Sequence, residues 1–171
     1  AGVFEGGTPC PGMPPTDGDE LPDFEALCCD GETFRSTHLS EAVGDRGAVL
    51  VSTGFVYSAI AQNWWKRFQK YGWDDFEDVP VLGISRDGPY AQNDFLRWLG
   101  RPPFRMFADV NGEVSEALDL LTDRDHMANV ATPWRSVFVV DPDLEVQFAY
   151  VADEWIGPLP HEDVEAAVAE L

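Results

Sequence analysis

Three apolar segments of strand length constrain the fold of this chain more than any other feature. They lie at residues 48–53, 79–85 and 136–140 and are apolar at nearly every position. Such a strand has to be covered on both faces, which is typical of the central strands of a parallel sheet. None of the three approaches the roughly 20 apolar residues of a membrane-spanning helix. The segments therefore predict a buried central sheet.

Helical and turn signals separate these strands. Six apolar side chains recur at helical spacing and predict one face of a helix that ends near Gly72; they are Tyr57, Ile60, Ala61, Trp64, Trp65 and Phe68. We also expect helices at residues 38–43, 89–99, 114–121 and 162–171, strands at 23–27, 33–35 and 105–107, a polar loop at 123–126, and a hairpin of 136–140 with 146–151. This order predicts an α/β domain of three layers, in which a central mixed sheet has helices on both faces.

The N-terminal residues differ in composition from the rest of the chain. Residues 1–20 are rich in Gly, Pro, Asp and Glu and are predicted to form an extended acidic arm. Residues 21–171 contain no repeat or low-complexity segment, and we expect them to form one domain. The arm begins without the basic and apolar stretches of a secretory signal, which favours the cytoplasm.

Acidic residues are spread over the whole chain. Asp and Glu number 31 against 11 Lys and Arg, which gives a formal net charge of −20. Molar salt shortens the Debye length to ~3 Å and so screens the repulsion within such a surface. The composition therefore favours a halophilic protein over a merely acidic mesophilic one. Since no basic patch is available to bind phosphates, neither nucleic acid nor a membrane is an expected partner.

The cysteines and histidines of the chain lack the spacing of a metal site, and we expect no metal or cofactor. Cys10 lies in the arm, and Cys28 and Cys29 are adjacent at the end of the first strand. Their neighbours Glu25 and Asp30 are expected to raise the pKa of both thiols. We expect one of the pair to pack inward and the other to be incidental. A strained vicinal disulfide is the rarer alternative.

Four stretches of the chain resemble, in the same order, the motifs of one family. Together they resemble the redoxins, that is, peroxiredoxins of the alkyl hydroperoxide reductase/thiol-specific antioxidant type, and the acidic composition suggests a haloarchaeal member. The resemblance covers residues 21–171 and implies a thioredoxin-like fold with a peroxiredoxin-type N-terminal hairpin. The stretches are Leu21-Pro-Asp-Phe24 with Asp30-Gly-Glu-Thr33 and Leu39; Val81-Leu-Gly-Ile-Ser85 with Pro89, Tyr90 and Phe95; Phe104 with Asp109 and Gly112-Glu113; and Arg135-Ser-Val-Phe-Val-Val-Asp141.

The resemblance also implies where an active site would lie. The family reads P-x-x-x-T/S-x-x-C where its central strand leads into a helix, and the cysteine is the peroxidatic nucleophile. Its thiolate is stabilised by the helix N-terminus and by an arginine. Alignment on Phe55 places Ser52 at the proline, Val56 at the threonine and Ala59 at the cysteine, and a shift by one residue places Ser58 there instead. Neither register supplies a cysteine.

Arg135 is the one member of that pocket that the sequence keeps. It has the capacity to bind an anion, but an ion pair with a carboxylate is the expected role in so acidic a chain. Trp64, Trp65 and Trp134 are candidates for the wall of the vacated pocket. The helical spacing of the first two favours the core instead.

Two functions remain open at this point. The residues favour a catalytically degenerate redoxin that serves as a scaffold or interaction module for an unknown protein or small molecule. The alternative is an antioxidant oxidoreductase, either a thiol peroxidase or a disulfide reductase, that uses Cys28 or Cys29 in place of the usual site. The resemblance further implies a possible homodimer.

Overall fold

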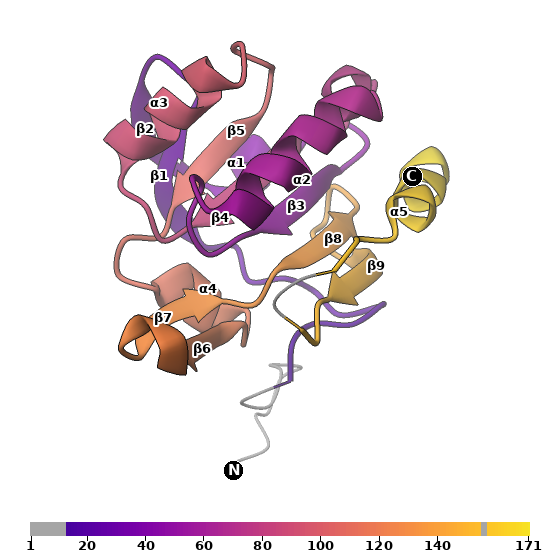
Figure 1. Ribbon diagram of the computed structural model, residues 1–171. Helices are drawn as coiled ribbons and strands as arrows, with labels where there is room; N and C mark the ends of the chain where they lie inside the picture. Colours follow the sequence, from indigo (N-terminus) through magenta and orange to yellow (C-terminus); the bar gives the residue numbers. More distant parts are fainter. Residues whose placement is uncertain (1–12, 155–156) are drawn as a thin grey trace.

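A seven-stranded sheet in the order β2-β1-β5-β4-β3-β8-β9 forms the centre of the molecule (Figure 1). The computed structural model describes residues 13–154 and 157–171. The pairs β3–β4 and β4–β5 are parallel and the other pairs antiparallel, so the sheet is mixed, as predicted. The strands are β1 (Glu25–Cys29), β2 (Phe34–His38), β3 (Ala48–Ser52), β4 (Val81–Ser85), β5 (Arg105–Ala108), β8 (Ser136–Val140) and β9 (Val146–Val151).

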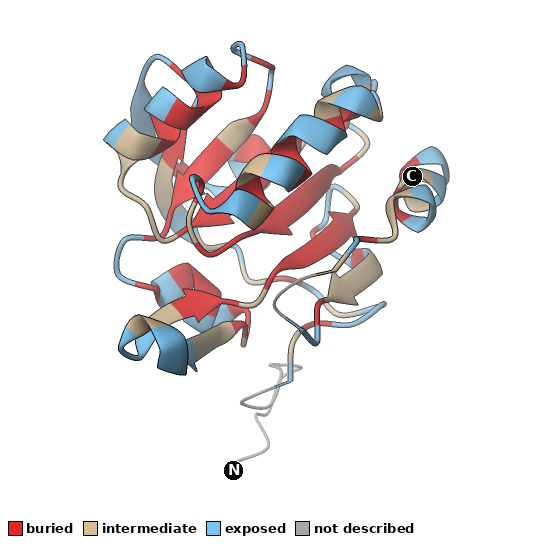
Figure 2. Cartoon of the chain, in the orientation of Figure 1, coloured by how far each residue is buried: buried red, intermediate tan, exposed pale blue. Residues whose placement is uncertain are grey.

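The three strands predicted to be buried lie side by side in the sheet. Every residue of β3, β4 and β8 is buried, and Figure 2 shows them as the inner part of the sheet. β3 pairs with β4 on one side and with β8 on the other. The coverage of both faces explains why these segments are apolar at nearly every position rather than at alternate positions.

Helices cover both faces of the sheet and create two apolar cores. On one face, α2 (Ala59–Lys70), α3 (Pro89–Trp98) and α5 (His161–Ala169) contribute buried side chains to one core. On the other face, α1 (Leu39–Ala42) and α4 (Glu113–Ala117) contribute to the second. The predicted three-layer α/β arrangement is confirmed.

The N-terminal hairpin also forms as predicted, with β1 and β2 antiparallel around a turn at Asp30. The Asp30 carboxylate accepts two backbone N–H groups of this turn at 2.8 and 2.9 Å. Gly31 has a φ of 102°, which a residue with a side chain rarely adopts. Of the predicted arm, residues 1–12 lie outside the described residues, whereas residues 18–21 are hydrogen-bonded to the backbone of residues 144–146.

The segment between α4 and β8 differs from the prediction. The sequence predicts a helix up to residue 121 and then a loop, but α4 ends at Ala117. The backbone turns at Asp119, whose φ of 53° is left-handed. A small antiparallel sheet of β6 (Leu121–Arg124) and β7 (Val130–Pro133) follows. These strands lack the alternating apolar pattern of a strand, and only Thr132 and Pro133 among their residues are buried.

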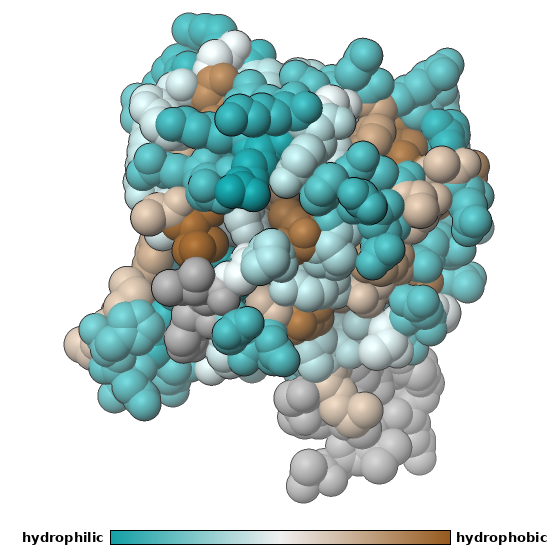
Figure 3. All heavy atoms as spheres, turned by 45° about the vertical axis from the view of Figure 1, so that its right-hand side comes forward, coloured by the Kyte–Doolittle hydropathy of each residue, from teal (hydrophilic) through white to brown (hydrophobic). Residues whose placement is uncertain are grey.

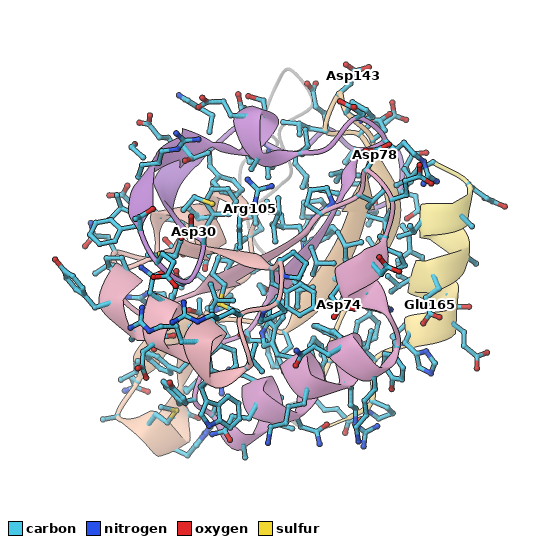
Figure 4. All side chains as sticks on the ribbon, turned by 90° about the horizontal axis from the view of Figure 1, so that it is seen from above. Asp30, Asp74, Asp78, Arg105, Asp143 and Glu165 are labelled. Carbon is cyan, nitrogen blue, oxygen red and sulfur yellow. The ribbon has the colours of Figure 1, made fainter. Side chains whose placement is uncertain are left out.

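Acidic side chains lie on many separate segments of the fold. Those labelled in Figure 4 are Asp30 in the hairpin turn, Asp74 in the short 3-10 helix after α2, Asp78 before β4, Asp143 between β8 and β9, and Glu165 on α5. In Figure 3, hydrophilic residues cover most of the face in view, and hydrophobic residues occupy small separate areas. No helix in the described part of the chain is long and apolar enough to cross a bilayer.

Candidate functional site

The first turn of α2 lies where the resemblance places the family's nucleophile. Ser58 is the N-cap residue, and its hydroxyl accepts a hydrogen bond from the backbone N–H of Ala61 at 3.2 Å. Ala59 is the first residue of the helix, and both Ser58 and Ala59 are exposed. The Ser58 oxygen therefore serves the helix cap, and the methyl group of Ala59 offers no reactive atom.

The residues before this turn have structural contacts. Val56 is fully buried, and its N–H donates to the carboxylate of Asp87 at 2.9 Å. The same Asp87 oxygen accepts the hydroxyl of Ser85 at 2.7 Å. Ser52 is buried in β3, and its hydroxyl donates to the carbonyl oxygen of Trp134 at 2.8 Å. Val56 thus supplies no hydroxyl to the site, and that of Ser52 is engaged within the sheet.

Arg135 is almost wholly buried, at 3% exposure, beside the start of α2. Its guanidinium donates to the backbone oxygens of Glu154 at 2.9 Å and Gly157 at 3.3 Å, and it lies 4.7 Å from the ring centroid of Trp64. Burial lowers the pKa of Arg135, while the nearby Tyr150 and Glu154 raise it. The expected ion pair is wrong for the described residues, because backbone carbonyls and an aromatic face take the place of a carboxylate.

A second arginine, Arg124 at the end of β6, reaches the same place. Its Nε donates to the hydroxyl of Thr132. A Cβ atom on Gly54 would lie 3.0 Å from its Nη2, so the guanidinium rests against the loop that leads into α2. Burial lowers the pKa of Arg124, and the positive charge of Arg135 lowers it further. Sequence reasoning missed Arg124 because it belongs to the unpredicted β6–β7 sheet.

The two arginines line one cavity of about 160 Å³. Its wall combines the two arginines with the first turn of α2 and with apolar side chains. The lining residues are Thr53, Gly54, Phe55, Ser58, Ala59, Ile60, Arg124, Met127 and Arg135. We call this space the arginine cavity. A larger cavity of about 590 Å³ begins on the other side of Ala59 and Ile60 and extends toward α5.

Cys28 and Cys29 lie apart from this cavity, since β5 and β4 separate β1 from β3. Three strand spacings of about 4.8 Å place the two strands roughly 14 Å apart. Both residues are free thiols and buried, at 7% and 0% exposure, so both pack inward where only one was expected to do so. Burial is the main cause that raises the pKa of both thiols, to about 12 for Cys29, and Asp30 adds to the effect.

Trp64 and Trp65 belong to a core, as their spacing predicted. Trp64 and Trp65 are 2% and 1% exposed within the core beneath α2. Trp64 has a second role, because its ring also carries the Arg135 guanidinium. Trp134 is half-buried against the opposite core. Among the described residues, no three His, Cys, Asp or Glu side chains gather as metal ligands would.

The sequence profile of the AhpC/TSA family matches residues 18–149. The chain belongs to the AhpC/TSA family. Alkyl hydroperoxide reductase C of Mycolicibacterium smegmatis is 37% identical over 92 residues, which cover 49% of this chain and 43% of that protein. The corresponding protein of Mycobacterium tuberculosis is 34% identical over the same length. The match thus spans less than half of these relatives.

Solved structures of peroxiredoxins share the fold of this AhpC/TSA chain. The reduced 2-Cys peroxiredoxin of Plasmodium vivax superposes with a TM-score of 0.74 at 20% identity, over 91% of this chain and 96% of that one. AhpC of Mycobacterium bovis gives a TM-score of 0.73 at 23% identity, over 91% and 92% of the two chains. The predicted thioredoxin-like fold and the family resemblance are confirmed.

Proposed function

We propose that this chain is a catalytically degenerate member of the AhpC/TSA family, which keeps the fold as a binding or interaction module. One observation carries the proposal: the first turn of α2 begins with Ser58 and Ala59, and no cysteine follows in the chain after residue 29. A thiolate is the nucleophile in thiol chemistry, whereas a serine hydroxyl is not acidic enough to replace it near neutral pH. Peroxide reduction therefore has no nucleophile at this position.

The rival function, an oxidoreductase that uses Cys28 or Cys29, has weaker support. Both side chains are buried within the sheet, and Cys29 has a pKa of about 12 against an ordinary value of 9.0. Because burial raises the pKa so far, very little of the reactive thiolate is present at pH 7. Peroxide would also have to reach side chains that are only 7% and 0% exposed. Neither thiol is suited to rapid attack.

Peroxide kinetics test the proposal directly. The reduced protein is mixed with hydrogen peroxide in molar KCl, and free thiols are titrated over time. We expect thiol loss no faster than that of free cysteine. Rapid loss that disappears in Cys29→Ser or Cys28→Ser would overturn the proposal and establish the rival function.

A matched pair of variants tests whether the start of α2 would still activate a thiol placed there. Ala59→Cys, in a chain whose native cysteines are serines, returns a thiol to the start of α2, and Asn63→Cys places one on an exposed position one helical turn later. Helix N-termini lower the pKa of a thiol there. We expect the cysteine at residue 59 to react with iodoacetamide at lower pH than the one at residue 63.

We further propose that the protein is adapted to a salt-rich cytoplasm, as in halophilic archaea. The supporting observation is a net charge of −20 whose carboxylates lie on many separate segments of the fold. Dense negative charge repels itself unless salt shortens the Debye length. A homodimer also stays a prediction, and sedimentation in molar KCl tests it. Nucleic acid and membranes are not proposed as partners.

A further inference from the structure

A third cavity lies beside the short 3-10 helix Trp73–Asp75, which follows α2. Its volume is about 230 Å³. Three aromatic residues, two prolines and two valines line it, together with two aspartates. The lining residues are Trp73, Asp74, Phe76, Asp78, Val79, Pro80, Val81, Pro103 and Phe104. We call this space the aromatic cavity.

The aromatic cavity is separate from the arginine cavity. No residue lines both of them. The arginine cavity includes Ser58 and Ala59 at the first turn of α2, whereas Trp73 follows its last turn. An α-helix rises 1.5 Å per residue, so α2 places roughly 18 Å between these two ends. An inference from the aromatic cavity therefore goes beyond the proposed function and depends on neither the thiols nor the arginines.

The aromatic walls of this cavity are held in place by their neighbours. Trp73 is 1% exposed and stacks on Phe68, with ring centroids 4.3 Å apart and 9° between the planes. Its indole N–H, the one polar group of the side chain, donates to Glu165 on α5 at 3.3 Å. The ring of Phe76 lies 6.0 Å from that of Trp73, and Phe104 is 1% exposed. Rings that are already fixed lose little conformational freedom when a ligand binds.

The charged groups that line the aromatic cavity are all negative. Asp74 and Asp78, both labelled in Figure 4, are exposed, and neither carboxylate has an ion-pair or hydrogen-bond partner among residues 13–154 and 157–171. No basic residue lines the cavity. Arg46 contacts the same loop, but its guanidinium donates to the backbone oxygens of Glu77 and Val168, each at 3.0 Å. The two carboxylates are therefore available to a cation.

This combination selects the kind of cation. The face of an aromatic ring attracts a positive charge that lies within about 6 Å of its centroid. A metal ion would lose water of hydration against the apolar walls, which is costly. A neutral apolar ligand would gain nothing from the carboxylates. An ammonium ion that carries methyl groups meets both conditions, because its charge is surrounded by apolar surface.

We propose that the aromatic cavity binds a compact methylated ammonium ion. Its methyl groups contact Trp73, Phe76 and Phe104, and Asp74 and Asp78 balance its charge. At about 30 Å³ per water molecule, the cavity has room for roughly seven waters. That space suits a ligand of about the size of choline.

Calorimetric titration with choline in 1 M KCl tests this proposal. Potassium is then present throughout, so binding of choline measures a preference over a simple cation. The control ligand is 3,3-dimethylbutan-1-ol, which has the shape of choline with a carbon atom in place of the charged nitrogen. We expect saturable binding of choline and at least about fivefold weaker binding of the alcohol. No saturable choline binding, or equal binding of the two ligands, would refute the proposal.

Three variants locate the ligand and separate the two parts of the site. Asp74→Asn is expected to weaken choline binding at least threefold, whereas Asp143→Asn removes the same charge outside the cavity and should bind as the parent does. Phe76→Leu replaces a half-buried ring with an aliphatic side chain. It should weaken choline binding at least fivefold and change binding of the alcohol less than twofold. Circular dichroism checks that each variant is folded.

The remaining outcomes of these titrations count against the proposal. Equal weakening by Asp74→Asn and Asp143→Asn would show that choline responds only to the net charge of the protein. Unchanged choline binding in Phe76→Leu would show that the ligand does not occupy the aromatic cavity. A spectroscopic readout gives an independent check, because the NMR signal of the Trp73 indole N–H should shift with choline. A signal that does not move at saturating choline would overturn the assignment of the site.

Discussion

Replacing Gly83 with alanine tests how α2 is held against the sheet. A Cβ atom on residue 83 would lie 2.8 Å from Cζ2 of Trp65 and 3.1 Å from Cγ of Met106. Trp65 is 1% exposed, and its ring lies 5.1 Å from that of Phe68 and 5.3 Å from that of Phe104. The indole therefore has no open space into which it can move. The glycine of the Val81–Ser85 stretch is thus a packing requirement of α2.

The size of the effect follows from these distances. Carbon atoms in contact are about 3.5–4.0 Å apart, so the indole or the strand would have to shift by roughly 0.7 Å or more. Overpacking of a core typically costs about 1–3 kcal/mol. In a domain of this size, 1 kcal/mol lowers Tm by about 2–4 °C. At the middle of that range, about 2 kcal/mol, Gly83→Ala is expected to lower Tm by about 4–8 °C.

Thermal unfolding followed by circular dichroism in molar KCl measures this change. Gly88→Ser is the matched control, because no atom lies within 4 Å of a Cβ there, its φ is −76°, and serine suits the N-cap position of α3 that Gly88 occupies. Adding Trp65→Phe to Gly83→Ala should recover part of the loss, since the smaller ring leaves room for the methyl group. Equal Tm values for Gly83→Ala and Gly88→Ser would refute the packing argument.

Three further predictions concern the cap, the salt and the thiols. Ser58→Ala removes the hydroxyl that accepts the hydrogen bond from the Ala61 N–H, and should lower the free energy of unfolding in urea by about 1 kcal/mol. Ser58→Asp keeps an oxygen acceptor there and should retain most of this stability. Lowering KCl from molar to about 0.1 M should loosen the fold, and an unchanged circular dichroism spectrum would contradict the proposed halophilic adaptation. Burial raises the pKa of Cys29 to about 12, so the folded state favours its neutral thiol. The free energy of unfolding should therefore be constant below pH 9 with respect to this group and fall between pH 9 and 12. Urea unfolding of Cys29→Ala over the same pH range should show a smaller fall.

Much of the fold could be predicted because its signals are local. The apolar strands β3, β4 and β8 were predicted from continuous hydrophobicity, and α2 from six side chains on one face. The N-terminal hairpin follows from the turn at Asp30 and Gly31. The helix over residues 114–121 was predicted wrongly, because the left-handed turn at Asp119 has no strong sequence signal.

The sequence by itself determined the layered fold, the family and the absence of a thiol at the start of α2. These depend on patterns within short segments of the chain. Only the tertiary structure brought Arg124 to Arg135 and buried both cysteines away from that place. Arg124 reaches the cavity through the pairing of two short polar strands and through the space left at Gly54. Contacts of this kind join residues far apart in the chain, and no periodicity or composition records them.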